Sequence, residues 1–387
     1  MLLWILLVLL LLCLWKLKAG QLKVVRSTTT PSFESSSILK VVHINVWSGS
    51  TYEFSKTKEQ GWRYFGYRVF EFLSGIGYDI DYYPGDDKEH RYEILCKQLK
   101  ELRPSVVTIN EAMPCMSYTS RLANEIGFDH IAHVGVGGVS FPFFQFPNFA
   151  EGDAILAHPS LKLKPMGRSR LSGFVFSNNF SINTGDATQL LAGMVTVNAQ
   201  QVIIGVTHWH AGVLEAPEVM KYIRNHLSPD EQQLGITSIA ESTSMRVSEA
   251  LQTVTLCKEL VCAQGGKPLI LCGDFNTTRT TPEFMILKQA GFQDYGCDQC
   301  TWDPKNRNVQ LQFKHGVEAS GSRNAVENKL YAVMGNEQLK LDHILTLGSC
   351  INFESSSTVL NSQAPPSDHY GIAATFQIQK KAGPIRE

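Results

Sequence analysis

The chain has 387 residues, of which 43% are hydrophobic and 18% charged, so it is long enough to bury one large core or two modest ones. Its 35 Lys and Arg residues against 36 Asp and Glu give a formal net charge of -1, which provides no strong positive field for gathering a nucleic acid. The nine cysteines are an odd number and are scattered, which does not fit the dense disulfide framework of a small secreted protein.

Residues 1–19 form a hydrophobic segment of the kind that enters membranes. Residues 1–15 contain no charged side chain and are mostly leucine. This length suits a signal peptide better than a membrane span, which needs about 20 apolar residues. However, no basic residue precedes the segment, residues 17–19 lack the pattern that cleavage prefers, and basic residues follow it. We therefore expect a single retained N-terminal membrane anchor, with a secreted chain as the alternative.

The rest of the chain is predicted to be one folded domain behind a tether. Residues 20–37 are rich in Ser and Thr and contain a Pro, as linkers often do. No internal repeat or later linker divides residues 38–379, and residues 380–387 are left as a tail.

Apolar runs and helical stripes alternate along this domain. Strands are predicted at 38–47, 106–110, 154–156, 194–197, 202–206, 269–272, 341–345 and 372–378. Helices are predicted at 92–102, 247–261 and 282–290, where apolar residues recur every three or four positions. Because the strands both alternate with helices and pair as hairpins, we expect an α/β domain with mixed sheets.

Polar side chains stand at or near the ends of most predicted strands. A single such residue is usually an ordinary solvated strand end or turn. So many in one chain are hard to assign to accident, because this edge of layered α/β folds is where sites are built. The residues are Asn45, Glu111, His208, Asp274, Asn276, Asp342, Asp368 and His369.

The stretch 267–278, KPLILCGDFNTT, carries the strongest chemical signal. Its buried strand delivers Asp274 and Asn276, which are two residues apart and therefore lean to the same side. A hydrated metal ion with a bound phosphate is one target that both could meet. Glu111 and Asn45 could hold Mg²⁺, which takes few oxygen ligands from protein and keeps several waters. His208 could then donate to a phosphate oxygen.

A base is the remaining requirement for hydrolysis. Asp368 and His369 are adjacent in a turn, and Asp342 lies in a separate strand. A carboxylate bonded to one imidazole nitrogen leaves the other nitrogen free to take a proton from water. His343 points to the opposite face from Asp342, and His43 sits back from its strand end, so we interpret both as structural.

Two zinc sites are alternatives. His210 shares a face with His208, but no third ligand follows nearby, so this reading is the weaker one. Cys297 and Cys300 could form a disulfide or half a zinc site, although no second such pair follows.

Taken together, these motifs resemble the endonuclease/exonuclease/phosphatase superfamily of DNase I-like phosphohydrolases. The resemblance rests on 45–47 NVW, 110–112 NEA, 152–156 GDAIL, 207–211 THWHA, 273–276 GDFN, 341–344 LDHI and 367–369 SDH, in this order. It implies a four-layer α/β sandwich with two central mixed sheets, a catalytic domain over 38–379, and dependence on Mg²⁺ or Mn²⁺.

The same resemblance implies a role for each strand-end residue. His208 would stabilise the transition state, Asp274 and Asn276 would orient water and phosphate, and Asp342 would orient His369. His369 and Asp368 would serve as the base. The implied metal ligands are Asn45, Glu111, Asp274, Asn276 and Asp368.

The substrate is less constrained by these motifs. The THWHA motif, the N-terminal segment and an aromatic stretch resemble the neutral sphingomyelinases, which implies a phospholipid headgroup such as sphingomyelin. The aromatic side chains, which could enter a membrane interface or simply pack a loop, are Phe141, Phe143, Phe144 and Phe146. The segments 212–244 and 303–338 look like insertions that could reshape the pocket.

These observations predict a Mg²⁺-dependent phosphodiesterase in which water attacks phosphorus in line. A nuclease or a small-molecule phosphatase of the same fold is the alternative, and the near-neutral charge counts against a nuclease. A non-catalytic adaptor would need a missing catalytic residue, and none is missing.

Overall fold

The computed structural model describes most of the predicted domain. The described residues are 22, 24–27, 37–47, 87–113, 115–134, 138–141, 144–145, 152–171, 174–177, 180–183, 188–314 and 325–379. Residues 1–19, where the anchor was predicted, lie outside this set. So do the side chains of the aromatic stretch at 141–146.

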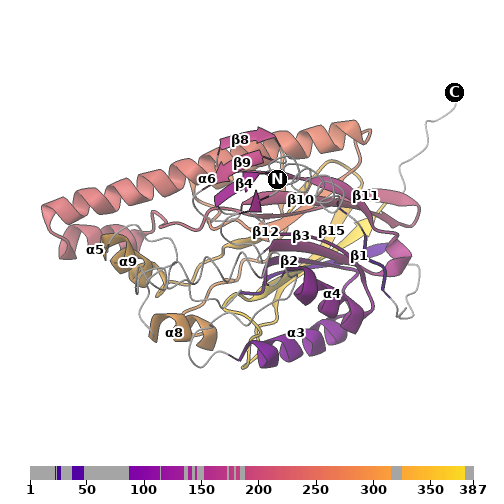
Figure 1. Cartoon of the computed structure of the whole chain (residues 1–387), viewed down its shortest axis with the longest axis horizontal. Helices are drawn as coiled ribbons and strands as arrows, with labels where there is room; N and C mark the ends of the chain where they lie inside the picture. The colour runs from indigo at the N-terminus through magenta and orange to yellow at the C-terminus, as the bar shows by residue number, and fades with distance from the viewer. Residues whose placement is uncertain are drawn as a thin grey trace, which may run out of the picture.

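Two six-stranded mixed sheets form the centre of the molecule (Figure 1). The first has the order β15-β16-β1-β2-β6-β3, with β15 Ile351–Val359, β16 Gly371–Ile378, β1 Ile38–Asn45, β2 Val106–Ala112, β6 Gly152–Ala157 and β3 Asp129–Val134. The second has the order β13-β14-β12-β11-β10-β7, with β13 Gln293–Asp294, β14 Asp342–Leu347, β12 Leu269–Asp274, β11 Gln200–His208, β10 Gln189–Val197 and β7 Lys164–Arg170. Each sheet contains one parallel pair, β1 with β2 and β11 with β12, among antiparallel ones.

Helices cover the outer face of each sheet, which completes four layers. On one side, α3 Lys88–Leu102 and α4 Cys115–Ile126 pack on the first sheet. On the other side, α6 Pro229–Ala263 and α7 Pro282–Gln289 pack on the second. Between the sheets, aliphatic side chains from both form a single buried cluster. The predicted four-layer sandwich with two mixed sheets is therefore confirmed.

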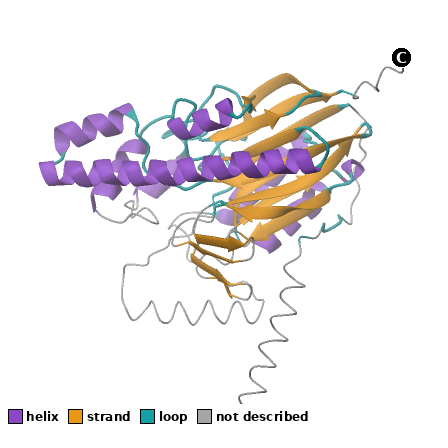
Figure 2. Ribbon diagram, turned by 90° about the horizontal axis from the view of Figure 1, so that it is seen from above, coloured by secondary structure: helices purple, strands orange, loops and turns teal. Residues whose placement is uncertain are grey.

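The two predicted insertions form helices. The first contains α5 Pro217–His226 and the N-terminal half of α6, which is 35 residues long and extends beyond the sheets (Figures 1 and 2). Helix α6 begins earlier than predicted, at a capping box in which Ser228 and Glu231 satisfy each other's backbone N–H groups. The second contains α8 Arg307–Lys314 and α9 Ala325–Met334. Helices α5, α6 and α9 share a small hydrophobic core of their own.

Several short elements lie outside the two central sheets. A 3-10 turn, Pro159–Leu161, follows β6. A four-stranded sheet has the order β5-β4-β9-β8, with β5 Phe144–Gln145, β4 Gly138–Phe141, β9 Phe180–Asn183 and β8 Phe174–Ser177.

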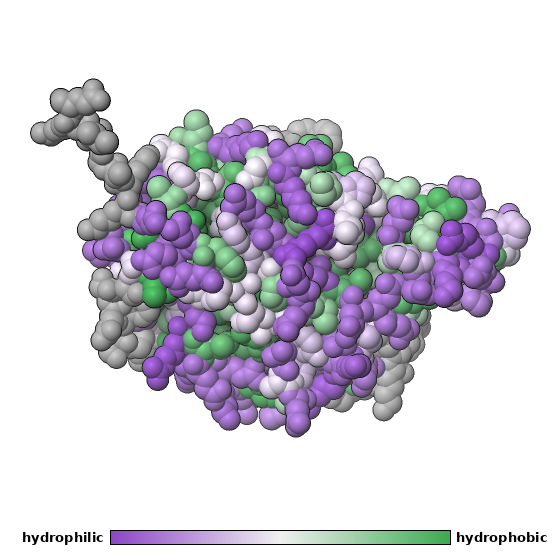
Figure 3. Space-filling view, turned by 180° about the vertical axis from the view of Figure 1, so that it is seen from behind, coloured by the Kyte–Doolittle hydropathy of each residue, from purple (hydrophilic) through white to green (hydrophobic). Residues whose placement is uncertain are grey.

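The predicted membrane location requires correction. Across the part of the chain that the structure describes, no helix is both long and apolar enough to cross a bilayer. The longest described helix, α6, carries charged side chains along its length, whereas a span needs about 20 predominantly apolar residues. The prediction of a single N-terminal membrane anchor is therefore not supported. On the face shown in Figure 3, hydrophilic residues are spread over the whole surface with apolar ones between them.

Candidate active site

A row of polar residues crosses the second sheet at one end. His208 on β11 lies directly opposite Asp274 on β12, and Asp274 lies directly opposite Asp342 on β14. Residues that face each other across neighbouring strands project to the same side of the sheet. Three of the predicted site residues therefore share one face, which looks toward the ends of β1 and β2 in the first sheet.

Asp274 is the centre of this row and is almost fully buried. Its Oδ2 accepts a hydrogen bond from Asn45 Nδ2 at 3.0 Å, and its Oδ1 accepts one from the backbone N–H of Asn276 at 2.9 Å. Asn45 Nδ2 also donates to Glu111 Oε1 at 2.8 Å. Because Asn45 belongs to the first sheet and Asp274 to the second, the bond between them joins the two sheets at the site.

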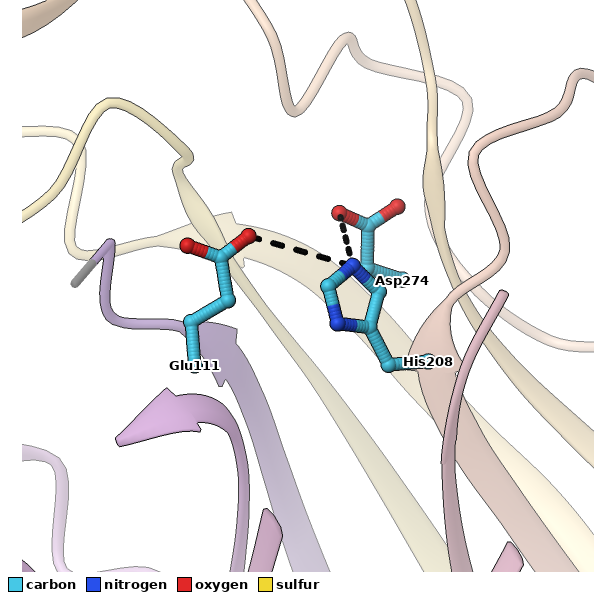
Figure 4. A group of neighbouring side chains, drawn as sticks. All are labelled: Glu111, His208 and Asp274. Carbon is cyan, nitrogen blue, oxygen red and sulfur yellow. Dashed lines mark ion pairs between the residues drawn. The ribbon is translucent and has the colours of Figure 1, made fainter. Parts of the chain in front are cut away.

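His208 stands between two carboxylates. Its Nε2 lies 3.8 Å from both Glu111 Oε1 and Asp274 Oδ2, and Figure 4 shows both carboxylates directed toward the imidazole. The side-chain amide of Asn276 contacts the same Nε2 at 3.2 Å and donates to the carbonyl of Trp209 at 2.9 Å. Glu111 and Asn276 are partly exposed, with 21% for the side chain of Glu111, whereas His208 and Asp274 are buried.

Backbone conformation aims two of these side chains. Glu111 has φ +56° and Asn276 has φ +47°, a left-handed conformation that costs most residues about 1 kcal/mol. The pairing of β2 with β6 shifts register between Ile109 and Ala112, which brackets Glu111. Such a bulge re-aims a side chain at the end of a strand.

A buried pair of side chains lies on the other side of Asp274. His369 Nδ1 is 2.8 Å from Asp342 Oδ2, and His369 Nε2 is 3.7 Å from Asp274 Oδ2. Burial lowers the pKa of His369, but Asp342, Asp274 and Asp368 outweigh it and hold this pKa well above its ordinary value. Burial likewise raises the pKa of Asp342, and His369 outweighs it, so this pKa lies below its usual range.

Asp368 occupies a different environment from the other carboxylates. Burial raises its pKa to about 6, while His369 lowers it and Glu111 raises it further. Its Oδ1 accepts a hydrogen bond from the hydroxyl of Ser367 at 3.0 Å. Asp368 therefore lies near the site without belonging to either of the closely spaced groups described next.

Two groups among the described residues bring possible metal ligands within 4.8 Å of one another. The first group consists of Glu111, His208 and Asp274. The second consists of Asp274, Asp342 and His369. Closely spaced buried carboxylates repel each other unless a cation or proton lies between them. A donor set dominated by carboxylate oxygens suits Mg²⁺ or Mn²⁺ better than softer ions. The residues therefore fit a hard divalent cation.

Asn45 is turned away from the role that the resemblance implies. Its Oδ1 accepts a hydrogen bond from the backbone N–H of Trp47 at 3.0 Å, and its Nδ2 faces the carboxylates of Glu111 and Asp274. In this arrangement, Asn45 holds the two carboxylates in place and does not direct its oxygen toward them, as a ligand of a shared metal ion would.

Asn110, which was not among the predicted site residues, links the sheets directly. Its Oδ1 accepts a hydrogen bond from the backbone N–H of Asp274 at 2.9 Å, and its Nδ2 donates to Asp153 Oδ1 at 2.6 Å. Both Asn110 and Asp153 lie within the quoted motifs, but no pattern in one strand shows which backbone in another sheet an amide will reach.

The segment that holds the 366–369 turn was not predicted to contribute to the site, because it lies in a predicted insertion. Asn306 Nδ2 donates to the carbonyls of Ser367 and Asp368, both at 2.9 Å. Asn308 Nδ2 donates to the carbonyls of residues 365 and 367 at 3.0 and 2.9 Å. Arg91 on α3 also donates to this turn, to the carbonyl of residue 366 at 3.1 Å.

Four other residues considered in the sequence lie apart from this group. The backbone N–H of His210 donates to Glu249 at 2.8 Å, and His210 belongs to neither metal-ligand group among the described residues. His343 Nδ1 lies 3.2 Å from Asp294 on the opposite side of β14, as strand alternation predicts. Cys297 and Cys300 are both free thiols.

Comparisons with known proteins establish the fold. No protein-family model matches the sequence, and no curated protein is significantly similar to it. Among solved structures, an endonuclease/exonuclease/phosphatase protein from Bacteroides vulgatus matches with a TM-score of 0.52 at 11% identity, over 88% of this chain and 99% of that one. A member of the same family from Bacteroides thetaiotaomicron matches with a TM-score of 0.50 at 14% identity, over 89% and 98%.

A third structure, a conserved protein of unknown function from Enterococcus faecalis, matches with a TM-score of 0.52 at 16% identity, over 88% of this chain and 100% of that one. At these identities, the likeness concerns the fold alone. The chain has the fold of the endonuclease/exonuclease/phosphatase, or DNase I-like, proteins, and the predicted resemblance is confirmed at that level.

Proposed function

We propose that this protein is a metal-dependent phosphoric ester hydrolase that cleaves phosphodiesters by in-line attack of water. The observation that carries the proposal is the position of Asp274, which has Glu111 and His208 on one side and the Asp342–His369 pair on the other. This arrangement supplies charge neutralisation, orientation and proton transfer around one point. The fold supports a phosphohydrolase, and the site residues support its chemistry.

Glu111 and Asp274 would hold the divalent cation, with Asn45, Asn276 and Asp368 around them. When bound, Mg²⁺ or Mn²⁺ polarises a phosphoryl oxygen and offsets developing negative charge. His208, close to both carboxylates, is placed to donate a hydrogen bond to a phosphoryl oxygen of the transition state.

Proton transfer falls to His369 in this proposal. Asp342 accepts a hydrogen bond from the Nδ1–H of His369. This leaves Nε2 directed toward Asp274 and the space in which water would be bound. The carboxylates raise the pKa of His369 above the value that suits a base at neutral pH. These carboxylates would hold the divalent cation, whose charge would offset theirs and bring this pKa back toward neutrality.

For the substrate, we propose a phospholipid headgroup phosphodiester such as sphingomyelin. The THWHA motif and the near-neutral charge support this choice. A nuclease or a phosphatase of the same fold would use the same group of residues.

A substrate screen tests the proposal. The protein would be assayed with Mg²⁺ or Mn²⁺ on vesicles of sphingomyelin or phosphatidylinositol, on DNA and on phosphate monoesters, with Asp274→Asn as the inactive control. Turnover of sphingomyelin supports the headgroup assignment. Turnover of DNA or monoesters alone would rule it out, and no turnover of any phosphate ester would contradict the proposed hydrolase.

A further inference from the structure

A continuous chain of buried polar atoms runs from the candidate base into the first sheet. His369 Nδ1 is 2.8 Å from Asp342 Oδ2, and Asp342 Oδ1 is 3.3 Å from His43 Nε2. His43 Nδ1 is in turn 2.9 Å from the hydroxyl of Thr108. Asp342, His43 and Thr108 are fully buried, so no bulk water competes for these contacts.

The contact between His43 and Asp342 is exclusive on both sides. Neither His43 Nε2 nor Asp342 Oδ1 has a hydrogen-bond partner elsewhere among the described residues. Their distance is that of an ion pair or a long hydrogen bond, although the ring is not ideally aligned for the latter. A buried carboxylate oxygen without a donor is costly, and His43 is the group that meets this need.

The position of His43 is unusual for its surroundings. Val41, two residues earlier on the same face of β1, belongs to the aliphatic cluster between the sheets, as does Leu39. His43 interrupts this apolar row where β1 passes β14, and it pairs in register with Thr108 on β2. An imidazole at this point gains nothing over an aliphatic side chain unless its polar atoms are used.

We infer that His43 is a positioning residue for the Asp342–His369 pair, an inference that rests on the proposed function of His369. In this role, His43 donates a hydrogen bond from Nε2 to Asp342 Oδ1 and accepts one at Nδ1 from the hydroxyl of Thr108. The Thr108 hydroxyl is nearer to Nδ1 than to its other partner, the carbonyl of Val42 at 3.5 Å. The carboxylate of Asp342 is thereby held at both oxygens, and its plane fixes the ring of His369.

Three substitutions separate this role from simple filling of space. His43→Leu keeps approximate volume and removes the donor, and we expect kcat to fall about 10-fold or more with little change in KM. His43→Gln keeps a donor near the position of Nε2, and we expect it to restore kcat to within about 3-fold of the wild type. Thr108→Val removes the hydroxyl behind His43 and should give a smaller loss in the same direction.

His343→Leu is the matched control. His343 is also fully buried and also faces an aspartate, but it lies on the opposite side of β14 from Asp342. The substitution His343→Leu should therefore lower the stability of the protein without lowering kcat. An equal loss of kcat in His43→Leu and His343→Leu would assign the effect to general destabilisation and overturn the inference.

A measurement without substrate keeps the inference separate from the proposed activity. In ¹⁵N-histidine-labelled protein, the Nδ1 proton that His369 donates to Asp342 should give a downfield NMR signal, identified by its loss in His369→Ala. This signal should shift or broaden in His43→Leu and return in His43→Gln. An unchanged signal in His43→Leu overturns the inference, whatever the activity. If His43→Leu does not fold, the same NMR signal is compared in His43→Gln and Thr108→Val. The inference then requires the signal to be kept in His43→Gln and altered in Thr108→Val.

Discussion

Single side chains at this site are set by contacts that span the two sheets. Asp274 receives its hydrogen bonds from Asn45 in the first sheet and from Asn276 next to it in the chain. Asn110 reaches across from the first sheet to the backbone N–H of Asp274. Each residue of the group thus fixes another, so that the positions of the carboxylates are determined before any ligand binds. Preorganisation of this kind is what an enzyme needs where charge develops during reaction.

Asp274→Ala and His369→Ala should each lower the rate of phosphodiester hydrolysis at least ~10²-fold, because each removes a group that acts in the transition state. Initial rates at saturating divalent cation measure the effect, and circular dichroism confirms that the fold is intact. Asp298→Ala is the control, because the side chain of Asp298 is 91% exposed and lies away from the group. Full activity in either site variant would mean that the proposed roles are wrong.

Asp153 should make the stability of the protein depend on pH. Burial raises its pKa to about 6, and its Oδ2 has no hydrogen-bond partner among the described residues. In the unfolded chain this carboxyl ionises near 3.8, so unfolding releases the cost of a buried charge. Its contribution to wild-type stability is therefore greatest below about pH 4 and is lost as the pH rises through about 6.

In Asp153→Asn this loss is absent, while the hydrogen bond from Asn110 can be kept. The free energy of unfolding of the variant, relative to the wild type, should rise by on the order of 2 to 3 kcal/mol between pH 4 and pH 8. Urea unfolding at a series of pH values measures this difference. His369 titrates in both proteins, so its contribution largely cancels. A difference that stays constant with pH would show that the pKa of Asp153 is not raised.

At the scale of elements, the site depends on segments that contribute no reactive group. The segment from Thr301 to Asn308 joins two separate parts of the site. The hydroxyl of Thr301 accepts hydrogen bonds from the backbone N–H groups of Leu341 and Asp342, both at 3.1 Å. Asn306 and Asn308 hold the turn at 365–368. Trp302 bridges to His369 in the backbone, and their rings meet edge to face at 5.3 Å. This segment therefore fixes Asp342 and His369 relative to each other.

The double variant Asn306→Ala, Asn308→Ala should loosen the 365–369 turn, because it leaves buried carbonyl groups without donors. We expect a lower kcat, together with a loss of stability of about 2 to 4 kcal/mol from the two sites. Amide hydrogen exchange of residues 367–370 should become faster, while exchange in β12 stays slow.

Asn336→Ala supplies the comparison for that experiment. Asn336 is exposed, and its side-chain amide donates to the carbonyl of Ala332, in the last turn of α9, at 2.8 Å. Its removal should leave both kcat and exchange in the turn unchanged. If the double variant behaved like this control, the segment 301–308 would have no positioning role.

For the molecule as a whole, the sequence predicts the buried parts better than the exposed ones. The strands at 269–274 and 106–112 are apolar runs because both of their faces are covered, and such runs are visible in a single sequence. By contrast, the edge strand β15 has the exposed, serine-rich sequence INFESSSTV, which shows no apolar pattern, and it was not predicted. The N-terminal half of α6 was missed because it packs mainly on α5 and α9 and not on a sheet.

The sequence predicts which residues belong to the candidate site, but not which of them contact one another. Strand ends gather at one edge in this class of fold, so Asp274, His208 and Glu111 could be expected to meet. Which partner each would hold depends on register between distant strands. For example, the pairing of Asp274 with Asp342 follows from the antiparallel alignment of β12 and β14. His43 was interpreted as structural because it sits back from its strand end, and no pattern in β1 shows that it faces Asp342 on β14.

Metal binding should stabilise the whole fold, because the two carboxylates nearest His208 belong to different sheets. Glu111 is the last residue but one of β2 in the first sheet and Asp274 ends β12 in the second, so a cation held by both would oppose separation of the layers. A ligand that binds only the folded state at 100 times its Kd adds about 2.7 kcal/mol to the free energy of unfolding. Mg²⁺ or Mn²⁺ should therefore raise the Tm of the chelator-treated protein and restore its activity.

Glu111→Gln tests whether the stabilisation comes from this bridge. The variant keeps the size of the side chain but removes the charge, so the shift in Tm produced by Mg²⁺ should shrink or vanish and activity should fall with it. Glu354→Gln, on the exposed strand β15, should show the wild-type shift. If Mg²⁺ raised the Tm of Glu111→Gln as much as that of the wild type, the stabilisation would not depend on the charge of Glu111. The cation would then be bound elsewhere.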